Sequence, residues 1–147
     1  MRIGQFVLTA AVAGAIGYHF YATSQNTIHG LTGPRFNLAV KNTPPLAEID
    51  LAGQIKGFDG YRMRGRYVIV QPGATIRIHD HVGRPAFSYI VNTTADQYRS
   101  DEPGPIAMKP GDLTADSNIS QWWRNTGGYP LTFYVVDIYQ PAGNKGE

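Results

Sequence analysis

The stretch GATIRIHDHVGRPAFSYIV, residues 73–91, decides the fold because it holds two strand-like segments joined by a turn. Residues 74–81 alternate apolar and polar side chains, and residues 86–91 are rich in aromatic and branched side chains. Both patterns are typical of β-strands. The sequence VGRP at 82–85 has turn chemistry, so the stretch predicts two consecutive strands of a β domain.

The two histidines of this stretch are one residue apart. Side chains two residues apart share a strand face, so His79 and His81 are expected to project together, with Asp80 pointing away. Two imidazoles directed into one barrel can share a metal ion. They are equally compatible with polar residues that hydrogen-bond to Gln121, Ser88 or water inside the barrel, and the spacing leaves both interpretations open.

The rest of the chain after residue 49 continues the β pattern. Further strands are predicted at 62–70, 97–99, 105–108, 121–124 and 131–139. Turn residues separate these segments, and the chain contains 17 glycines, 10 prolines and 9 tyrosines, which favours short strands over a helical bundle. Short strands at this spacing predict an all-β barrel or sandwich.

Composition limits the classes of function. With 147 residues the chain is long enough for one domain with a core. Its net charge is +2, from 13 Lys and Arg against 11 Asp and Glu, so an extended nucleic-acid surface is not expected. The absence of cysteine excludes disulfides, thiolate metal sites and thiol nucleophiles, and it leaves the cellular compartment open.

The amino-terminal segment differs from everything that follows. Residues 3–22 carry no charged side chain, and as a helix they would span about 30 Å, which matches the hydrocarbon core of a bilayer. Arg2 and the amino terminus place positive charge before the segment, and three aromatic residues suited to the membrane interface lie near its end: Tyr18, Phe20 and Tyr21. We therefore expect a transmembrane helix with a cytoplasmic amino terminus. The alternative is a cleaved signal peptide with its cleavage site at residues 13–15.

Small residues on this helix predict a partner. Ala10 with Gly14, and Ala13 with Gly17, are four residues apart on one helix face. This small-xxx-small spacing allows close approach of a second membrane helix, so these four residues are candidate partner-binding positions. The alternative is that alanine and glycine are simply common in membrane helices.

Residues 23–48 contain glycines and prolines with little periodicity, which predicts an extended linker that could wrap a partner. The sequence thus divides into a transmembrane helix at 1–22, this linker at 23–48, a β domain at 49–142 and a tail at 143–147. Within the β domain, Arg62, Arg64 and Arg66 alternate along one strand and are expected on one face, where they could dock an acidic partner.

Two motifs resemble those of the cupins. Gly73, five residues and then His79-Asp80-His81 resemble the opening of the first cupin motif. Residues 110–112 (PGD) and 121–127 (QWWRNTG), with the strand that follows, resemble the second motif, including its asparagine at Asn125. The resemblance is to small bacterial cupins, covers about residues 49–141, and implies a cupin-type double-stranded β-helix, or jelly-roll, barrel.

The resemblance also implies a ligand set that this chain lacks in part. Cupin metal sites use two histidines and a glutamate from the first motif and a histidine from the second. Here the glutamate position falls on Pro85 or Ala86, and the last histidine is replaced by Gln121. His79, His81 and Gln121 remain as candidate metal ligands, but a neutral amide is a poor ligand, so a divalent metal would be bound weakly. We expect no firmly held cofactor.

Two functions remain for such a chain. The first is a membrane-anchored, non-catalytic accessory subunit of a larger membrane complex, anchored in a bacterial inner membrane with its barrel on the periplasmic side. No Ser/His/Asp arrangement and no phosphate-binding glycine loop is apparent, which favours this hypothesis. The alternative is a metal-dependent cupin enzyme or a small-molecule binder that uses His79 and His81.

Overall fold

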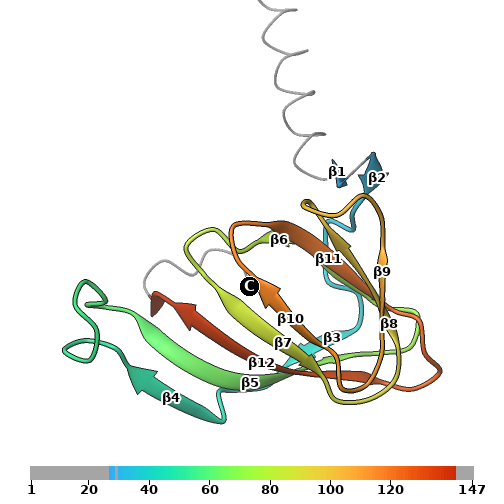
Figure 1. The fold of residues 1–147 in the computed structure, drawn as a ribbon. Coiled ribbons are helices and arrows are strands. Elements are labelled where there is room, and N and C mark those ends of the chain that lie inside the picture. The colour runs from blue at the N-terminus through green and yellow to red at the C-terminus, as the bar shows by residue number, and fades with distance from the viewer. Residues whose placement is uncertain (1–26, 29, 142–147) are drawn as a thin grey trace, which may run out of the picture.

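The computed structural model describes residues 27–28 and 30–141, and these residues form only strands, turns and loops (Figure 1). In chain order the strands are β1 (Thr27–Ile28), β2 (Leu31–Thr32), β3 (Val40–Asn42), β4 (Ala47–Asp50), β5 (Arg62–Val70), β6 (Thr75–Asp80), β7 (Ala86–Ile90), β8 (Ala95–Arg99), β9 (Ile106–Met108), β10 (Leu113–Asp116), β11 (Ser120–Asn125) and β12 (Leu131–Tyr139).

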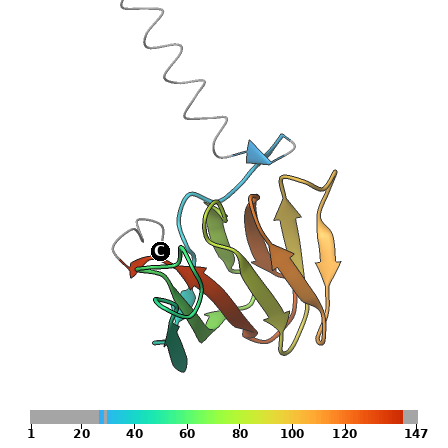
Figure 2. The ribbon, with the colours of Figure 1, turned by 60° about the vertical axis from the view of Figure 1, so that its left-hand side comes forward.

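Two antiparallel sheets face each other around a common interior (Figures 1 and 2). The larger sheet has the strand order β10-β7-β12-β5-β3, and β4 pairs with a second part of β5. The smaller sheet has the order β6-β11-β8-β9. Strands far apart in sequence are neighbours in both sheets, so the two cupin-like motifs meet in the same interior.

Large apolar side chains from both sheets fill the closed part of this interior. Ile90, Leu131 and Val70 are fully buried, and Trp123 and Phe133 are 2% exposed. The rings of Trp123 and Phe133 pack edge to face with centroids 4.8 Å apart. Because Trp123 belongs to β11 and Phe133 to β12, this contact joins the smaller sheet to the larger one.

The predicted strands are largely confirmed. Strands β5 and β12 have the bounds expected from the sequence, and the other predicted strands are present within two residues of their expected ends. Strand β10 was not expected, because a four-residue edge strand offers too short a pattern to recognise.

The expected linker at 23–48 contains short paired strands, because β1 pairs with β2 in its first half. Strand β3 and the first half of β4 lie within this range and pair with β5. A long strand presents a row of backbone donors and acceptors, and short segments without periodicity can pair with that row. The strands that pair in the larger sheet therefore include residues that precede residue 49.

The expected transmembrane helix and the tail at 143–147 lie outside the described residues. Across residues 27–28 and 30–141, no helix has the length and apolar character needed to cross a bilayer.

Replacement of a core side chain tests this packing. We expect Ile90→Ala to lower the free energy of unfolding by about 2–5 kcal/mol. The removed side-chain atoms would leave a void that the neighbouring side chains fill only in part. The neighbouring Val91 is 44% exposed, so Val91→Ala should cost less than about 0.5 kcal/mol. Urea unfolding of the full chain measures both values. Equal losses for the two variants would contradict the described burial.

Candidate functional site

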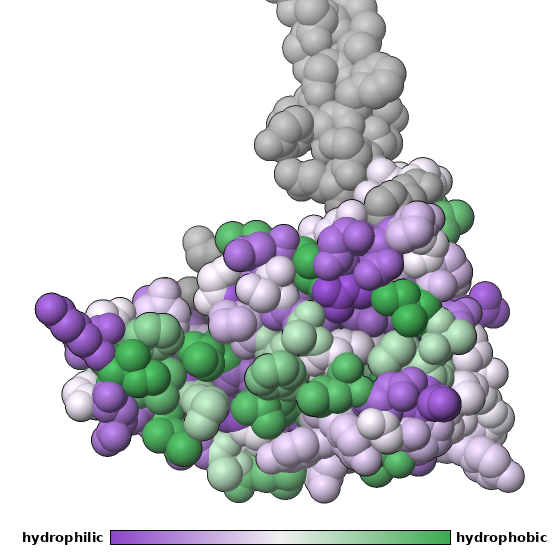
Figure 3. Space-filling model, in the orientation of Figure 1, coloured by the Kyte–Doolittle hydropathy of each residue, from purple (hydrophilic) through white to green (hydrophobic). Residues whose placement is uncertain are grey.

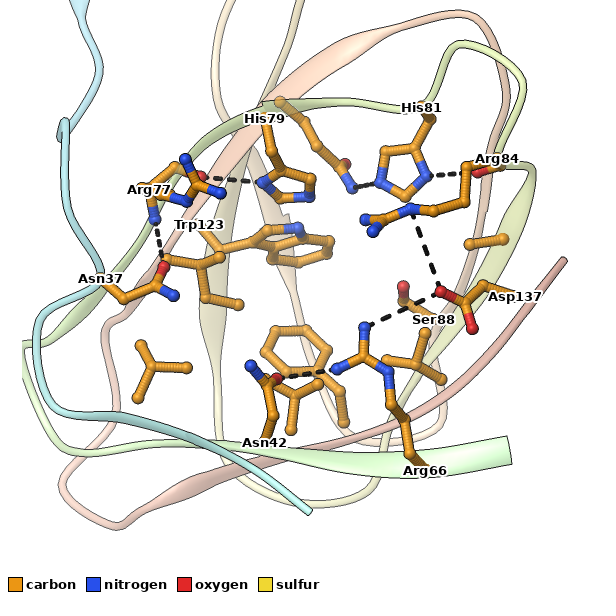
Figure 4. A pocket seen from close by; sticks show the side chains of 17 residues that line it. Asn37, Asn42, Arg66, Arg77, His79, His81, Arg84, Ser88, Trp123 and Asp137 are labelled. Atoms are coloured by element: carbon orange, nitrogen blue, oxygen red, sulfur yellow. Dashed lines mark hydrogen bonds and ion pairs between the residues drawn. The ribbon is translucent and has the colours of Figure 1, made fainter. Parts of the chain in front are cut away.

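A cavity of about 640 Å³, counting its open mouth, lies between the two sheets (Figure 4). Its wall combines an apolar part, which includes Trp123, Phe133 and Val135, with a polar part that includes both histidines. The histidines and Gln121 therefore lie in one place, as the sequence predicted, although they come from β6, the turn after it, and β11.

Each histidine uses one ring nitrogen to donate to a backbone carbonyl. Nδ1 of His79 lies 2.8 Å from the carbonyl oxygen of Arg77, and Nδ1 of His81 lies 3.0 Å from that of Arg84. A carbonyl oxygen only accepts, so the proton of each neutral ring is on Nδ1. Nε2 of both rings is therefore an acceptor. The two ring centroids are 5.1 Å apart.

Gln121 occupies the acceptor position of His81. Its amide nitrogen Nε2 lies 2.9 Å from Nε2 of His81 and 3.2 Å from Oδ2 of Asp116. An ionised carboxylate only accepts, so the atom that faces Asp116 is the NH₂ group. This group donates to both partners, and both ring nitrogens of His81 are thus hydrogen-bonded.

Asp116 is the centre of a buried polar network. Gln97 Nε2 donates to Gln121 Oε1 at 2.6 Å and approaches Asp116 Oδ1 at 3.3 Å. Asp116 also accepts hydrogen bonds from Ser88, Thr114 and Arg99. Gln97, Asp116 and Gln121 are each 1% exposed. A network this completely satisfied holds the orientation of the Gln121 amide.

The candidate ligands His79, His81 and Gln121 are not arranged to hold a divalent metal ion. The lone pair of His81 accepts from Gln121, and the Gln121 carbonyl oxygen accepts from Gln97. Ala86, at one candidate position for the cupin glutamate, offers no oxygen ligand to the cavity wall. Among residues 27–28 and 30–141, no group of three His, Cys, Asp or Glu side chains is placed to hold a metal. Of the expected ligands His79, His81 and Gln121, only Nε2 of His79 is left as a nitrogen ligand, and a single imidazole binds such ions weakly.

Burial sets the charge of both imidazoles. It lowers the pKa of His79 to about 4, despite the opposing hydrogen bond to the Arg77 carbonyl. Burial also lowers the pKa of His81, with the nearby carboxylate of Asp116 acting in the opposite direction. Both rings are therefore neutral near pH 7 and cannot serve as general acids there.

The sequence did not predict the charged cluster on the opposite wall. Arg64 donates to both carboxylate oxygens of Asp137, from Nε at 2.8 Å and from a terminal nitrogen at 3.1 Å. Arg66 and Arg84 approach Asp137 Oδ2 at 3.8 and 4.0 Å. Alternation placed Arg62, Arg64 and Arg66 on one face for an acidic partner. Arg64 and Arg66 point inward and are buried, whereas Arg62 is exposed and pairs with Glu48. One feature of the sequence could have indicated this charged cluster: Asp137 is a lone charge in the apolar run LTFYVVDIY.

The candidate partner-binding residues of the amino-terminal helix, Ala10, Ala13, Gly14 and Gly17, lie outside the described residues. They remain a prediction from sequence.

Comparison with solved structures identifies the fold. KdgF from a Halomonas species matches with a TM-score of 0.53 at 13% identity, over 73% of this chain and 87% of that one. The cupin domain of Cnp3 from Schizosaccharomyces pombe matches with a TM-score of 0.52 at 13% identity, over 74% and 67% of the two chains. A conserved protein with a double-stranded β-helix domain from Klebsiella pneumoniae matches with a TM-score of 0.51 at 16% identity, over 74% and 81%.

The described domain therefore has the cupin-type double-stranded β-helix fold. At these identities the likeness concerns the fold alone. No protein-family model matches the sequence, and no curated protein is significantly similar to it.

The metal argument is tested by zinc binding. We expect the full chain to retain no stoichiometric zinc after equilibrium dialysis, because Gln121 and the Arg84 carbonyl already use both nitrogens of His81. The double variant His79→Ala/His81→Ala is the control and should match the wild type. One equivalent of zinc in the wild type that disappears in the double variant would show a metal site in the barrel.

The neutral state of His79 predicts a pH dependence. In the unfolded chain His79 takes up a proton near its ordinary pKa of 6.5, whereas in the folded chain it does so only near pH 4. Its contribution to stability is therefore complete above 6.5 and lost as the pH falls toward 4, by at most about 3 kcal/mol. Urea unfolding between pH 7 and 4 should show a smaller loss for His79→Gln. Identical pH profiles for variant and wild type would contradict the lowered pKa.

Proposed function

We propose that this chain is a membrane-anchored, non-catalytic accessory subunit, in which residues 3–22 form the anchor and the cupin domain binds another protein of a membrane complex on the periplasmic side of a bacterial inner membrane. The observation that carries the proposal is the outer face of the larger sheet, which is apolar although it lies on the outside of the domain.

This outer face is defined by the outward positions of four adjacent strands. Burial alternates along β5, β7, β10 and β12, which separates inward from outward side chains. The outward positions are Met63, Gly65, Tyr67, Ile69, Phe87, Tyr89, Leu113, Ala115, Thr132, Tyr134, Val136 and Ile138. None is charged, and Thr132 is the only residue among them that is neither apolar, aromatic nor glycine. Figure 3 shows apolar residues gathered over this part of the molecule.

The strand register aligns the largest of these side chains. Leu113, Tyr89, Tyr134 and Tyr67 follow one another across β10, β7, β12 and β5. They are 59%, 41%, 37% and 37% exposed, respectively. Tyr67 and Tyr134 pack edge to face with centroids 5.7 Å apart. The row is thus a continuous aromatic and aliphatic ridge rather than a set of scattered residues.

An uncharged, exposed sheet face supports contact with protein. Antiparallel sheets usually place polar residues on their solvent side, whereas the outward positions of β5 and β12 are apolar or aromatic apart from Thr132. Contiguous exposed apolar surface marks sites of association, and tyrosine is enriched in protein interfaces. The absence of charge disfavours nucleic acid as the partner.

The same structure gives no support to catalysis by His79 and His81. The alternative from the sequence is a metal-dependent enzyme. It would need a ring nitrogen of His81 as a ligand, and both nitrogens are already hydrogen-bonded, one to the Arg84 carbonyl group and one to Gln121. Both imidazoles are also neutral near pH 7, with His81 buried and His79 partly buried. A binding role requires none of these groups to react.

Co-purification tests the accessory role. Membranes that contain the tagged full chain are washed, solubilised in mild detergent and purified, and the co-purifying proteins are identified. We expect a reproducible partner whose yield falls at least about tenfold for Tyr89→Lys, since a charge buried at an apolar interface is strongly unfavourable.

Tyr129→Lys is the matched control, because Tyr129 is 74% exposed and lies outside the outer face, in the turn before β12. A chain that is absent from the membrane fraction, or that migrates alone in a native gel, contradicts the proposal. Equal partner yields for Tyr89→Lys and the wild type would show that the outer face is not the surface that binds the partner.

A further inference from the structure

Two hydrogen-bonding groups of the cavity wall are not used by the protein itself. Nδ1 of His79 donates to the Arg77 carbonyl, so Nε2 of this ring is an acceptor. The indole nitrogen Nε1 of Trp123 can only donate. Both side chains line the cavity, and among residues 27–28 and 30–141 no group donates to His79 Nε2 and none accepts from Trp123 Nε1. One free acceptor and one free donor are thus left for whatever fills the cavity.

The strand register brings these two groups together. His79 of β6 lies across from Gln121 of β11, and Trp123 is two residues further along β11. Such diagonal neighbours on one face of an antiparallel pair have backbones about 7–8 Å apart, which leaves their side chains within reach of a common ligand. Figure 4 shows both side chains at one end of the cavity. A single group that donates and accepts can therefore serve both nitrogens.

The rest of this part of the wall favours a ligand with a carbon body. Val40, Val68, Phe133 and Val135 line the same cavity and offer no hydrogen bond to water. A buried donor or acceptor without a partner is unfavourable, so the two nitrogens require one. One water occupies only about 30 Å³, whereas the cavity, counting its open mouth, is about 640 Å³. A hydroxyl group on a short carbon chain matches both the polar pair and the apolar surface.

The charged wall is not needed for this recognition. Arg66 donates to Asn42 and approaches Asp137, and Arg84 also approaches Asp137. These side chains have contacts of their own, so no charge is assigned to the ligand. A neutral molecule leaves those contacts in place and brings no charge of its own out of water.

We propose that the barrel of this protein binds a small neutral alcohol, whose hydroxyl group donates to His79 Nε2 and accepts from Trp123 Nε1, with its carbon chain packed on Phe133 and Val135. The site lies inside the domain and is separate from the outer face, so the proposal does not depend on the accessory role. It requires no metal and no chemical step.

The two tryptophans of the chain provide the readout and its internal control. Trp122 stacks on Tyr98 with ring centroids 3.6 Å apart and does not line the cavity, whereas Trp123 does. The full chain, labelled with ¹⁵N, is prepared in detergent, and both indole N–H resonances are recorded during titration with 1-butanol. Free ligand is measured in the same sample. We expect a saturable shift of the Trp123 resonance and no shift of the Trp122 resonance.

Two further probes of similar size test the chemical class. Methyl propyl ether, an isomer of 1-butanol, accepts a hydrogen bond but cannot donate one, and 1-chlorobutane lacks the hydroxyl group. Both should bind at least about tenfold more weakly than 1-butanol, because His79 Nε2 would stay buried without a partner. Equal affinity for the ether and the alcohol, equal shifts of both tryptophan resonances, or no response to 1-butanol, which would leave water as the only occupant, would overturn the proposal.

A variant locates the hydroxyl contact. His79→Phe keeps a ring of similar size but removes the acceptor, so it should weaken 1-butanol binding about tenfold and leave the affinity for the ether unchanged. Asp80→Asn is the matched control, since Asp80 is the exposed neighbour at the end of β6. Unchanged affinity for 1-butanol in folded His79→Phe, or an equal loss in Asp80→Asn, would overturn the assignment. If His79→Phe does not fold, the comparison of alcohol with ether in the wild type decides.

Discussion

The donation from Gln121 to both His81 and Asp116 is the constraint on which the interior of the barrel depends. These three residues come from different segments and are buried, so none of them can turn to water for a hydrogen bond. Because Asp116 can only accept, the amide has one allowed orientation, and that orientation uses the lone pair that His81 would otherwise offer to a metal. The Gln121 amide thus ties the lone pair of His81 into a buried hydrogen-bond network.

The opposite wall of the same cavity is organised by charge rather than by neutral hydrogen bonds. Asp137 stands at an inward position of β12, directly across from Arg64 in the strand register. That pairing accompanies the inward positions of Arg64 and Arg66. The cavity therefore has a neutral imidazole and amide side and a cationic side, with aromatic residues between them.

The distribution of polarity between inside and outside is unusual for a single domain. Near the cavity, charged and amide side chains lie inside the barrel, while the outward positions of β5 and β12 are apolar or aromatic, apart from Thr132. Tyr134 lies across Gly65, where a side chain on residue 65 would collide with its hydroxyl group. The larger sheet thus has an inner face that packs on the core and an outer face that is apolar although it is exposed.

The sequence by itself determined the strands with long apolar runs and the common face of His79 and His81, because both follow from the two-residue period of a strand. It also indicated the cupin fold through its two motifs. It did not determine which side of β5 faces inward: alternation groups Arg64 with Arg66, but only the position of Asp137 on the neighbouring strand decides that they are buried. Nor could it orient Gln121, whose partner His81 is 40 residues away in the chain. Local periodicity fixes which side chains share a face, whereas hydrogen bonds and ion pairs between distant strands exist only once the sheets have closed.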